Sequence, residues 1–169
     1  NVSPAQLLQA GFLASFIKLY DEYDITPDAI AIEITETFLM SNFTETVARL
    51  KYLREKGVPI YLDDFGTGYS SLLYLNELPI DYIKIDREFV KDLSTSKSSR
   101  TIVSKLISLA NELNIKVIAE GVETDFQAQF LLKNGCSLIQ GWLVSKAVVR
   151  NEVLKLFDFH EDVTVKKGS

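Results

Sequence analysis

Carboxylate side chains stand at or near the ends of four segments that have the alternating pattern of β-strands. They are Glu33, the pair Asp63 and Asp64, Asp86 and Glu120. Leaving an unpaired carboxylate in a protein interior costs on the order of several kcal/mol, even after the protein relaxes. Parallel strands bring their carboxyl ends to one mouth of a barrel, where catalytic groups lie. The joint pattern therefore favours one functional cluster of oxygen ligands.

The ligands of this cluster would all be oxygen atoms, because His160 and Cys136 are the only histidine and the only cysteine. Carboxylates without imidazole or thiolate favour hard cations such as magnesium, manganese or calcium over zinc. Carboxylates packed this closely repel one another unless they are protonated or bridged by a metal. Lys84 is the one cation in the pattern, and it could contact a phosphate or a metal-bound hydroxide. The single cysteine also excludes an intramolecular disulfide.

Each of these residues has an ordinary structural explanation when it is taken alone. Asp63 and Asp64 alone are typical of a turn or a helix cap. Lys84 alone is typical of a salt bridge, and Glu120 followed by Gly121 is typical of a strand-to-turn junction. The functional interpretation depends on the combination, because four successive strands carry an ionisable group near the same end.

A glycine-containing segment at residues 63–72 follows one strand and opens a helix. Gly66 and Gly68 permit unusual backbone angles, and Ser70 or Ser71 can cap the helix. The structural explanation is a tight strand-to-helix turn. The functional explanation is a mobile loop that sets the geometry of the neighbouring aspartates. Glycine spacing alone leaves both explanations open.

The composition is that of one soluble globular domain. The chain has 169 residues, of which 47% are hydrophobic and 24% are charged, enough for a hydrophobic core. The net charge of −5 argues against nonspecific binding to DNA, RNA or anionic membranes. No apolar run reaches the roughly 20 residues of a membrane span, and no signal segment opens the chain. We therefore expect a cytoplasmic location, although a longer parent protein could be anchored to a membrane elsewhere.

Strand-like and helix-like segments alternate along the chain, and this predicts a parallel sheet with helices packed outside it. The strands are expected at residues 29–36, 59–65, 82–87, 116–122 and 138–142. The helices are expected at residues 3–23, 42–57, 69–76, 98–113, 124–135 and 152–157. Ile32 and Ile34 should face the helices and Glu33 the opposite side, because side chains alternate along a strand. One domain is expected over residues 1–160, followed by a polar, disordered tail at residues 161–169.

Local signals support the helices. Ser3 with Gln6 and Thr124 with Gln127 have the spacing of capping boxes. Apolar residues in the helix expected at 98–113 predict one stripe that packs against the sheet. The stripe consists of Ile102, Val103, Leu106, Leu109, Ala110 and Leu113.

Six short segments resemble the motifs of EAL domains and occur in the order of that family. Any one of them is a weak signal, but six in order are highly specific. They are Asn1-Val2-Ser3, Glu33-Ile34-Thr35-Glu36, residues 63–72, Lys84-Ile85-Asp86, residues 119–124 and Gln140-Gly141-Trp142. The resemblance covers nearly the whole chain and implies an α/β fold of the TIM-like (β/α) barrel type.

The resemblance implies a metal-dependent phosphodiesterase that opens cyclic di-GMP to linear pGpG with two divalent ions, Mg²⁺ or Mn²⁺, and with Ca²⁺ as an inhibitor. The implied metal ligands are Asn1, Glu33, Asp63, Asp64 and Glu120. The implied catalytic residues are Lys84, Glu120 and Asp64. The implied pocket residues are Asp86, Glu123 and Gln140. The residues that would steady the loop at 63–72, through which the family also dimerises, are Glu36, Gly66 and Gly68.

The sequence departs from the family pattern in two places. The Glu-x-Leu segment that names the family lies upstream of Asn1-Val2-Ser3, so the expected barrel is N-terminally truncated and lacks its first strands. A whole barrel of this type has about 250 residues. We therefore expect a fragment, or a partner chain that supplies the missing strands. Ser145-Lys146-Ala147 stands where the family has Ser-Lys-Pro, which leaves the interpretation of the site unchanged.

Three functions are open on this basis. The retained ligand set favours a phosphodiesterase, with activity expected of the complete domain. The absent Glu-x-Leu segment favours, for this chain, an inactive EAL-like module that binds cyclic di-GMP or a protein partner. The ordered motifs disfavour an unrelated metal-dependent barrel enzyme. The expected partners are cyclic di-GMP, a second copy bound through the loop at 63–72, and an upstream sensory or GGDEF-type domain of the parent protein.

Overall fold

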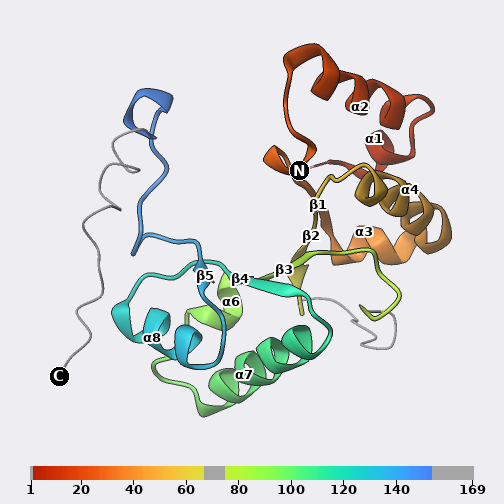
Figure 1. Ribbon diagram of the computed structural model, residues 1–169. Coiled ribbons are helices and arrows are strands. Elements are labelled where there is room, and N and C mark those ends of the chain that lie inside the picture. Colours follow the sequence, from red (N-terminus) through yellow and green to blue (C-terminus); the bar gives the residue numbers. More distant parts are fainter. Residues whose placement is uncertain (1, 67–74, 154–169) are drawn as a thin grey trace.

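A parallel sheet forms the centre of the computed structural model, which describes residues 2–66 and 75–153 (Figure 1). Within these residues the sheet has five strands in the sequential order β1-β2-β3-β4-β5. They are β1 (Ile32–Thr35), β2 (Ile60–Phe65), β3 (Tyr82–Ile85), β4 (Lys116–Ala119) and β5 (Leu138–Ile139). Each neighbouring pair is parallel. Consecutive parallel strands joined through helices are the arrangement of a TIM-like barrel, which confirms the predicted α/β class.

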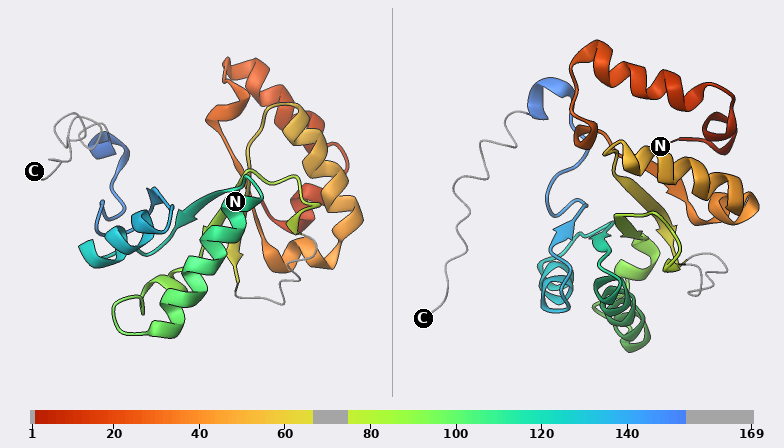
Figure 2. Two further views of the ribbon diagram at one scale, coloured as in Figure 1. Left: turned by 60° about the horizontal axis from the view of Figure 1, so that its bottom comes forward. Right: turned by 45° about the vertical axis from the view of Figure 1, so that its right-hand side comes forward.

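Helices connect the strands and cover the sheet. They are α3 (Glu36–Ser41) and α4 (Phe43–Glu55) between β1 and β2, α6 (Arg87–Val90) and α7 (Lys97–Glu112) between β3 and β4, and α8 (Asp125–Lys133) between β4 and β5. Before the first strand come α1 (Pro4–Leu8), α2 (Phe12–Tyr23) and a 3-10 turn at Pro27–Ala29. Figure 2 shows α4 beside β1 and β2, with α7 and α8 beside the other half of the sheet. Among the described residues, no helix is both long and apolar enough to cross a membrane.

The core lies between the helices and one face of the sheet. Ile32 and Ile34 are buried there, as the alternating pattern predicts, while Glu33 on the other face stays partly exposed. The same alternation of apolar residues holds in the next three strands, except that Asp63 and Asp64 separate Leu62 from Phe65 in β2 and that Lys84 on the polar face of β3 is itself buried. The buried apolar residues of these strands are Ile60, Leu62, Phe65, Ile83, Ile85, Val117 and Ala119. Because the apolar side chains are buried against the helices, the polar side chains of each strand lie on the opposite face of the sheet. That face carries the candidate site.

Several expected elements differ in their limits, and the strands expected at residues 116–122 and 138–142 end early, at Ala119 and Ile139. The helix expected at residues 3–23 is interrupted, because Gly11 adopts a left-handed φ of 81° between α1 and α2. The capping boxes at Ser3 and Thr124 are both formed. The strand expected at 29–36 ends before Glu36, which begins α3. The strand expected at 82–87 ends at Ile85, because α6 begins immediately beyond it.

The apolar stripe of α7 is shifted from the predicted one. Ile102, expected on the stripe, is 42% exposed, whereas Ile107 is fully buried. The buried line runs through Val103, Ile107 and Ala110, a spacing of four and three residues that keeps these side chains on one side of a helix. The assignment of Ile102 to the stripe was therefore wrong.

Some expectations concern residues outside the described ranges. Asn1, Gly68 and the tail expected at 161–169 lie wholly outside them. The helices expected at 69–76 and 152–157 lie partly outside. Val2, the first described residue, donates its backbone N–H to the carbonyl of Glu33 over 3.2 Å. The start of the described chain therefore lies beside β1.

Candidate active site

Lys84 lies at the centre of the acidic cluster. Its Nζ is 2.6 Å from Glu120 Oε1, 3.2 Å from Asp63 Oδ1 and 3.4 Å from Glu33 Oε1. Glu33 is on β1, Asp63 on β2 and Lys84 on β3, while Glu120 directly follows β4. The parallel register thus brings together four of the charged residues that the sequence analysis singled out.

Burial and charge act in opposite directions on Lys84. Its side chain is only 8% exposed, and burial alone would lower the pKa of the ammonium group. The hydrogen bond and charge of Glu120, followed by the charges of Asp63 and Glu33, outweigh burial and raise the pKa above its ordinary value. Lys84 is therefore a fixed positive charge that partly neutralises the carboxylates around it.

A β-bulge brings Asp63 and Asp64 to the same site. The pairing of β2 with β3 shifts in register between Leu62 and Phe65. Two residues of β2 therefore stand opposite Lys84 alone. Asp64 accommodates the extra residue with a φ of 55°, a left-handed conformation that aspartate adopts more readily than most residues. The backbone N–H of Asp64 also donates a hydrogen bond to Asp63 Oδ1 over 3.1 Å.

Asp64 and Asp86 interact at the rim of the cluster. Burial raises the pKa of Asp64, and the charges of Asp63 and Asp86 raise it further. A side-chain hydrogen bond with Asp86 acts in the same direction, while Lys84 acts against it. Asp86 is also the N-cap of α6, because its carboxylate accepts the Glu88 N–H over 2.6 Å. Asp86 therefore fixes the turn into α6 while facing Asp64.

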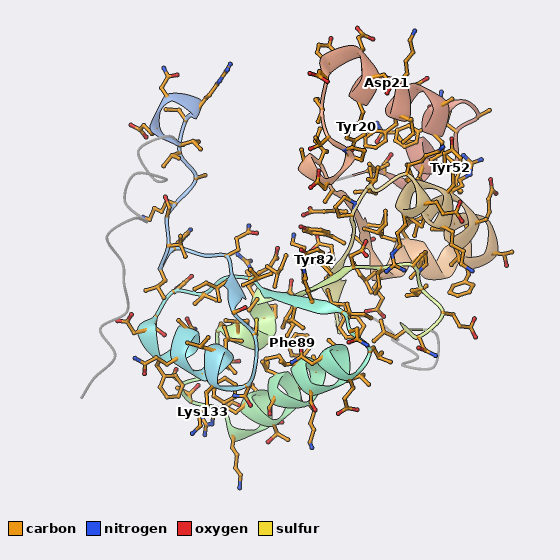
Figure 3. The ribbon with its side chains drawn as sticks, in the orientation of Figure 1. Tyr20, Asp21, Tyr52, Tyr82, Phe89 and Lys133 are labelled. Atoms are coloured by element: carbon orange, nitrogen blue, oxygen red, sulfur yellow. The ribbon has the colours of Figure 1, made fainter. Side chains whose placement is uncertain are left out.

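Two tyrosines form the layer of the sheet face next to the cluster. The rings of Tyr61 on β2 and Tyr82 on β3 have centroids 4.3 Å apart. Lys116 Nζ donates to the Tyr82 hydroxyl over 3.1 Å. Figure 3 shows Tyr82 on the side of the strands away from α7, and Phe89 on the side of α7. The face that carries Lys84 thus continues as an aromatic and polar surface along the strands.

Glu36 connects the start of α3 to the end of β2. Its side chain is 5% exposed, and its Oε2 accepts the N–H of Gly66 over 3.1 Å. Gly66 has a φ of 94°, and a Cβ there would lie 3.1 Å from the ring of Phe89. Among the described residues, Glu36 Oε1 is buried without a hydrogen-bond partner. Gly66 and Glu36 therefore fix the beginning of the segment at 63–72, most of which lies outside the described ranges.

A cavity of about 460 Å³ opens beside the cluster at Glu120. Glu123 and Gln140, both predicted as pocket residues, line it. The sequence analysis did not assign Arg87, Trp142 or Lys146 to the site, although they line the same cavity. Arg87 comes from the connection after β3, whereas Trp142 and Lys146 both come from the segment after β5. The signal that could have found them was the pair of glycines, Gly121 and Gly141, which let those connections approach each other.

The acidic residues are not arranged as a ready metal site. Within residues 2–66 and 75–153, no group of three or more acidic, histidine or cysteine side chains has a geometry that could hold a metal ion. The carboxylates of Glu33, Asp63 and Glu120 converge on the Lys84 ammonium instead. Their chemistry is still that of a hard-cation site, because the donors are oxygens only. These residues therefore fit a hard divalent cation in the type of their donor atoms and in their closeness to one another.

Comparison with known proteins gives a consistent result. The family model described as "EAL domain" matches residues 1–147. The chain is 45% identical over 140 residues to a Pseudomonas aeruginosa protein named cyclic di-GMP phosphodiesterase NbdA, an alignment that covers 83% of this chain and 16% of NbdA. It is 38% identical over 154 residues to MucR of the same organism, named a bifunctional diguanylate cyclase and cyclic di-GMP phosphodiesterase. That match covers 91% of this chain and 22% of MucR.

Solved structures agree with these relatives. The MucR phosphodiesterase in complex with cyclic di-GMP superposes with a TM-score of 0.85 at 38% identity, over 90% of this chain and 62% of that one. Klebsiella pneumoniae BlrP1, solved with cyclic di-GMP and either calcium or manganese, superposes with a TM-score of 0.79 at 35% identity. That match covers 85% of this chain and about 37% of BlrP1. The chain thus spans less than two thirds of each of these relatives.

Proposed function

The chain belongs to the EAL domain family, and we propose that it provides the catalytic residues of a metal-dependent phosphodiesterase that hydrolyses cyclic di-GMP to linear pGpG. The observation that carries this proposal is the convergence of Glu33, Asp63 and Glu120 on Lys84. The similar proteins NbdA and MucR are named cyclic di-GMP phosphodiesterases, MucR as a bifunctional one. The activity is proposed for the complete domain in its parent protein.

The donor set suits Mg²⁺ or Mn²⁺. The proposed ligands are Asn1, Glu33, Asp63, Asp64 and Glu120. Two ions bound there would supply an activated water and stabilise negative charge on the phosphoryl oxygens. Burial raises the pKa of Asp64 and the charges of Asp63 and Asp86 raise it further, and a divalent cation bound to this carboxylate would offset that repulsion. The BlrP1 complexes with calcium or manganese support the use of a divalent cation, and we propose that Ca²⁺ binds but does not support turnover.

The residues of the chain have separate roles in this proposal. Lys84 provides a fixed charge that can attract a phosphate oxygen, because its ammonium is protonated and held by three strands. Asp64 and Glu120 flank it from opposite sides and are proposed to orient the attacking water. Glu123 and Gln140 line the adjoining cavity, where the nucleotide would extend. Asp86 caps α6, whose first residue, Arg87, lines that cavity.

A second candidate function follows from the arrangement of the carboxylates. Because the described residues present no ready metal group and Lys84 holds three of the carboxylates, the chain could bind cyclic di-GMP without turnover. This candidate makes a different prediction from the first one. A binding module would retain affinity for the nucleotide when Lys84 or Glu120 is neutralised, whereas an enzyme would lose its rate.

Hydrolysis by the chain in its parent protein tests both candidates. Conversion of cyclic di-GMP to pGpG is followed by chromatography with Mg²⁺, with Mn²⁺ and with excess chelator. The enzyme proposal predicts turnover that stops with chelator and falls at least 100-fold in Glu120→Gln. Glu112→Gln, on the exposed surface of α7, is the matched control and should keep full activity. Tight binding of the nucleotide without pGpG under all conditions would support the binding module instead.

Two partners are also proposed. The loop at 63–72, held at its start by Glu36 and Gly66, is proposed to contribute to a homodimer. The parent protein is proposed to carry a sensory or GGDEF-type domain upstream, since the chain covers only 22% of the bifunctional relative MucR. Light scattering of the wild-type chain and of Glu36→Gln tests the first of these proposals. A monomer at all concentrations would reject it.

A further inference from the structure

Gln127 is a buried glutamine on α8 whose side chain joins two segments of the chain. It is 5% exposed and does not line the cavity. Its Oε1 accepts the backbone N–H groups of Glu123 and Thr124 over 2.8 and 2.9 Å. Its Nε2 donates to the carbonyls of Val90 and Lys91 over 3.1 and 3.5 Å. A glutamine amide has two lone pairs and two N–H groups, so every one of them is used here.

The cap of α8 explains only part of this arrangement. In a capping box the glutamine needs to accept only the N–H of the N-cap residue, which is Thr124. The second N–H comes from Glu123, which lines the cavity beside the charged cluster. The amide N–H groups of Gln127 are directed at the end of another helix, α6. The side chain therefore connects the start of α8 to the end of α6.

The connection after β4 is held against α6 at two points. At the first, Gly121 lies so close to α6 that an added Cβ would be 2.4 Å from the Cβ of Arg87. At the second, Gln127 donates to the carbonyl of Val90. Arg87 and Val90 are the first and the last residue of α6. Residues 121–127 therefore follow α6 over its whole length.

Both of the joined segments carry acidic groups of the candidate site. The segment after β4 carries Glu120, a member of the charged cluster, and Glu123 on the cavity wall. The N-cap of α6 is Asp86, whose side chain forms a hydrogen bond with that of Asp64. A displacement of about 1 Å caused far from the reacting atoms can cost on the order of 100-fold in rate. The distance between these two pairs of carboxylates depends on Gln127.

We infer that Gln127 is a positioning residue for the reaction, which fixes the acidic residues after β4 relative to those at the start of α6. This inference rests on the proposed function, because it concerns the rate of the same hydrolysis. Gln127 itself contacts no reacting group. Its Oε1 holds the backbone at Glu123, on the wall of the cavity, and its Nε2 holds α6 and with it Asp86.

Two substitutions separate the hydrogen bonds of Gln127 from its volume. Gln127→Met keeps a flexible side chain of similar length and removes the hydrogen bonds. Gln127→Glu keeps the acceptor and loses the donors, because an ionised carboxylate only accepts. Hydrolysis of cyclic di-GMP by the parent protein is measured with Mn²⁺ well below the Tm. Gln127→Met should lower kcat/KM roughly 10- to 100-fold. Gln127→Glu should lower kcat while KM stays close to the wild-type value.

Hydrogen exchange of the parent protein without substrate gives a readout that does not depend on turnover. The N–H groups of Glu123 and Thr124 should exchange faster in Gln127→Met and stay protected in Gln127→Glu. Asn134→Ala is the matched control, because Asn134 is an amide at the other end of α8 that donates to the Phe130 carbonyl within the same helix over 2.7 Å. This control should leave kcat, KM and the exchange at Glu123 unchanged.

Each outcome decides between the positioning role and its alternatives. Wild-type kcat and KM in both Gln127 variants, with an active wild type, would overturn the positioning role and leave the proposed function intact. An equal loss of kcat/KM in Asn134→Ala would indicate general destabilisation and would also overturn it. If Gln127→Met does not fold, the kcat and KM of Gln127→Glu decide alone. Failure of the wild-type parent protein to form pGpG would reject the proposed function and the positioning role together.

Discussion

Asp63 and Asp64 are consecutive in β2, yet both face Lys84, because a bulge places two residues opposite one. The register shift between Leu62 and Phe65 returns Phe65 to the buried face and leaves the two carboxyl groups on the polar side. Burial raises the pKa of Asp64, and repulsion from the neighbouring Asp63 carboxylate raises it further. The bulge thus concentrates negative charge at the carboxyl end of the sheet.

Asp64→Asn should remove activity without harming the fold. Asparagine also adopts left-handed backbone angles, so the φ of 55° is retained while the repulsion with Asp63 and Asp86 is relieved. We expect an unchanged or higher Tm together with a fall in hydrolysis of at least 100-fold. Calorimetry and the pGpG assay measure the two effects separately. Asp21→Asn on α2, which Figure 3 labels far from the strands, is the control.

Lys84→Met should destabilise the protein, and divalent cations should partly restore its stability. Removing one partner of a buried ion pair costs about 3–5 kcal/mol, because the other charges are left uncompensated. Added Mn²⁺ should raise the Tm of this variant more than that of the wild type, since a cation can replace the ammonium. Lys91→Met, which removes an exposed lysine paired with Glu88, should change little. Equal stability of Lys84→Met and the wild type without metal would contradict the central role of Lys84.

Cys136 should be unreactive in the folded protein. The thiol is 1% exposed and donates toward the carbonyls of Leu138 and Val117. Burial raises its pKa, so little thiolate is present at neutral pH. A disulfide reagent should react slowly with the native chain and at once with the unfolded chain. Fast reaction of the native chain would show that the sheet opens around β5.

The raised pKa of Cys136 also makes the free energy of unfolding depend on pH. The folded state holds the thiol proton more tightly than the unfolded state does. The stabilisation that results is therefore fully present below the ordinary thiol pKa. It is lost as the pH rises through the higher pKa of the folded state. The free energy of unfolding of the wild type should therefore fall more steeply above about pH 8.5 than that of Cys136→Ala.

Gly141→Ala should destabilise the site through a steric clash. The added Cβ would lie 2.2 Å from the carbonyl oxygen of Val122 and 2.3 Å from its nitrogen, so backbone must move. Gly11→Ala separates this effect from backbone strain, because Gly11 has a φ of 81° but open space around it. Gly11→Ala should cost about 1–2 kcal/mol, and Gly141→Ala should cost more. Urea denaturation measures both values, and the reverse order would contradict the close packing at Val122.

The sequence was sufficient to predict which faces of the strands are polar. Alternation places Glu33 opposite Ile32 and Ile34, and this rule is local to one strand. The bulge was not predictable in the same way, because it depends on how β2 pairs with β3. The alternation rule by itself would have sent Asp64 to the face opposite Asp63.

The other residues that line the cavity could not be predicted from the sequence for a similar reason. Trp142 belongs to a quoted motif, but its place beside Arg87 depends on three connections meeting in space. The interruption at Gly11 was missed because the apolar pattern continues on both sides of it. Ile102 was assigned to the wrong side of α7, since several apolar residues in that helix offered two overlapping stripes.

The three carboxylates around Lys84 leave it no spare donor. A lysine ammonium has three N–H groups, and Glu120, Asp63 and Glu33 can take one each. A phosphate oxygen can therefore reach this nitrogen only by exchange with a carboxylate. The longest of the three contacts, 3.4 Å to Glu33, is the one most easily given up. A phosphate bound at Lys84 would thus displace the Glu33 carboxylate while β1 stays paired with β2.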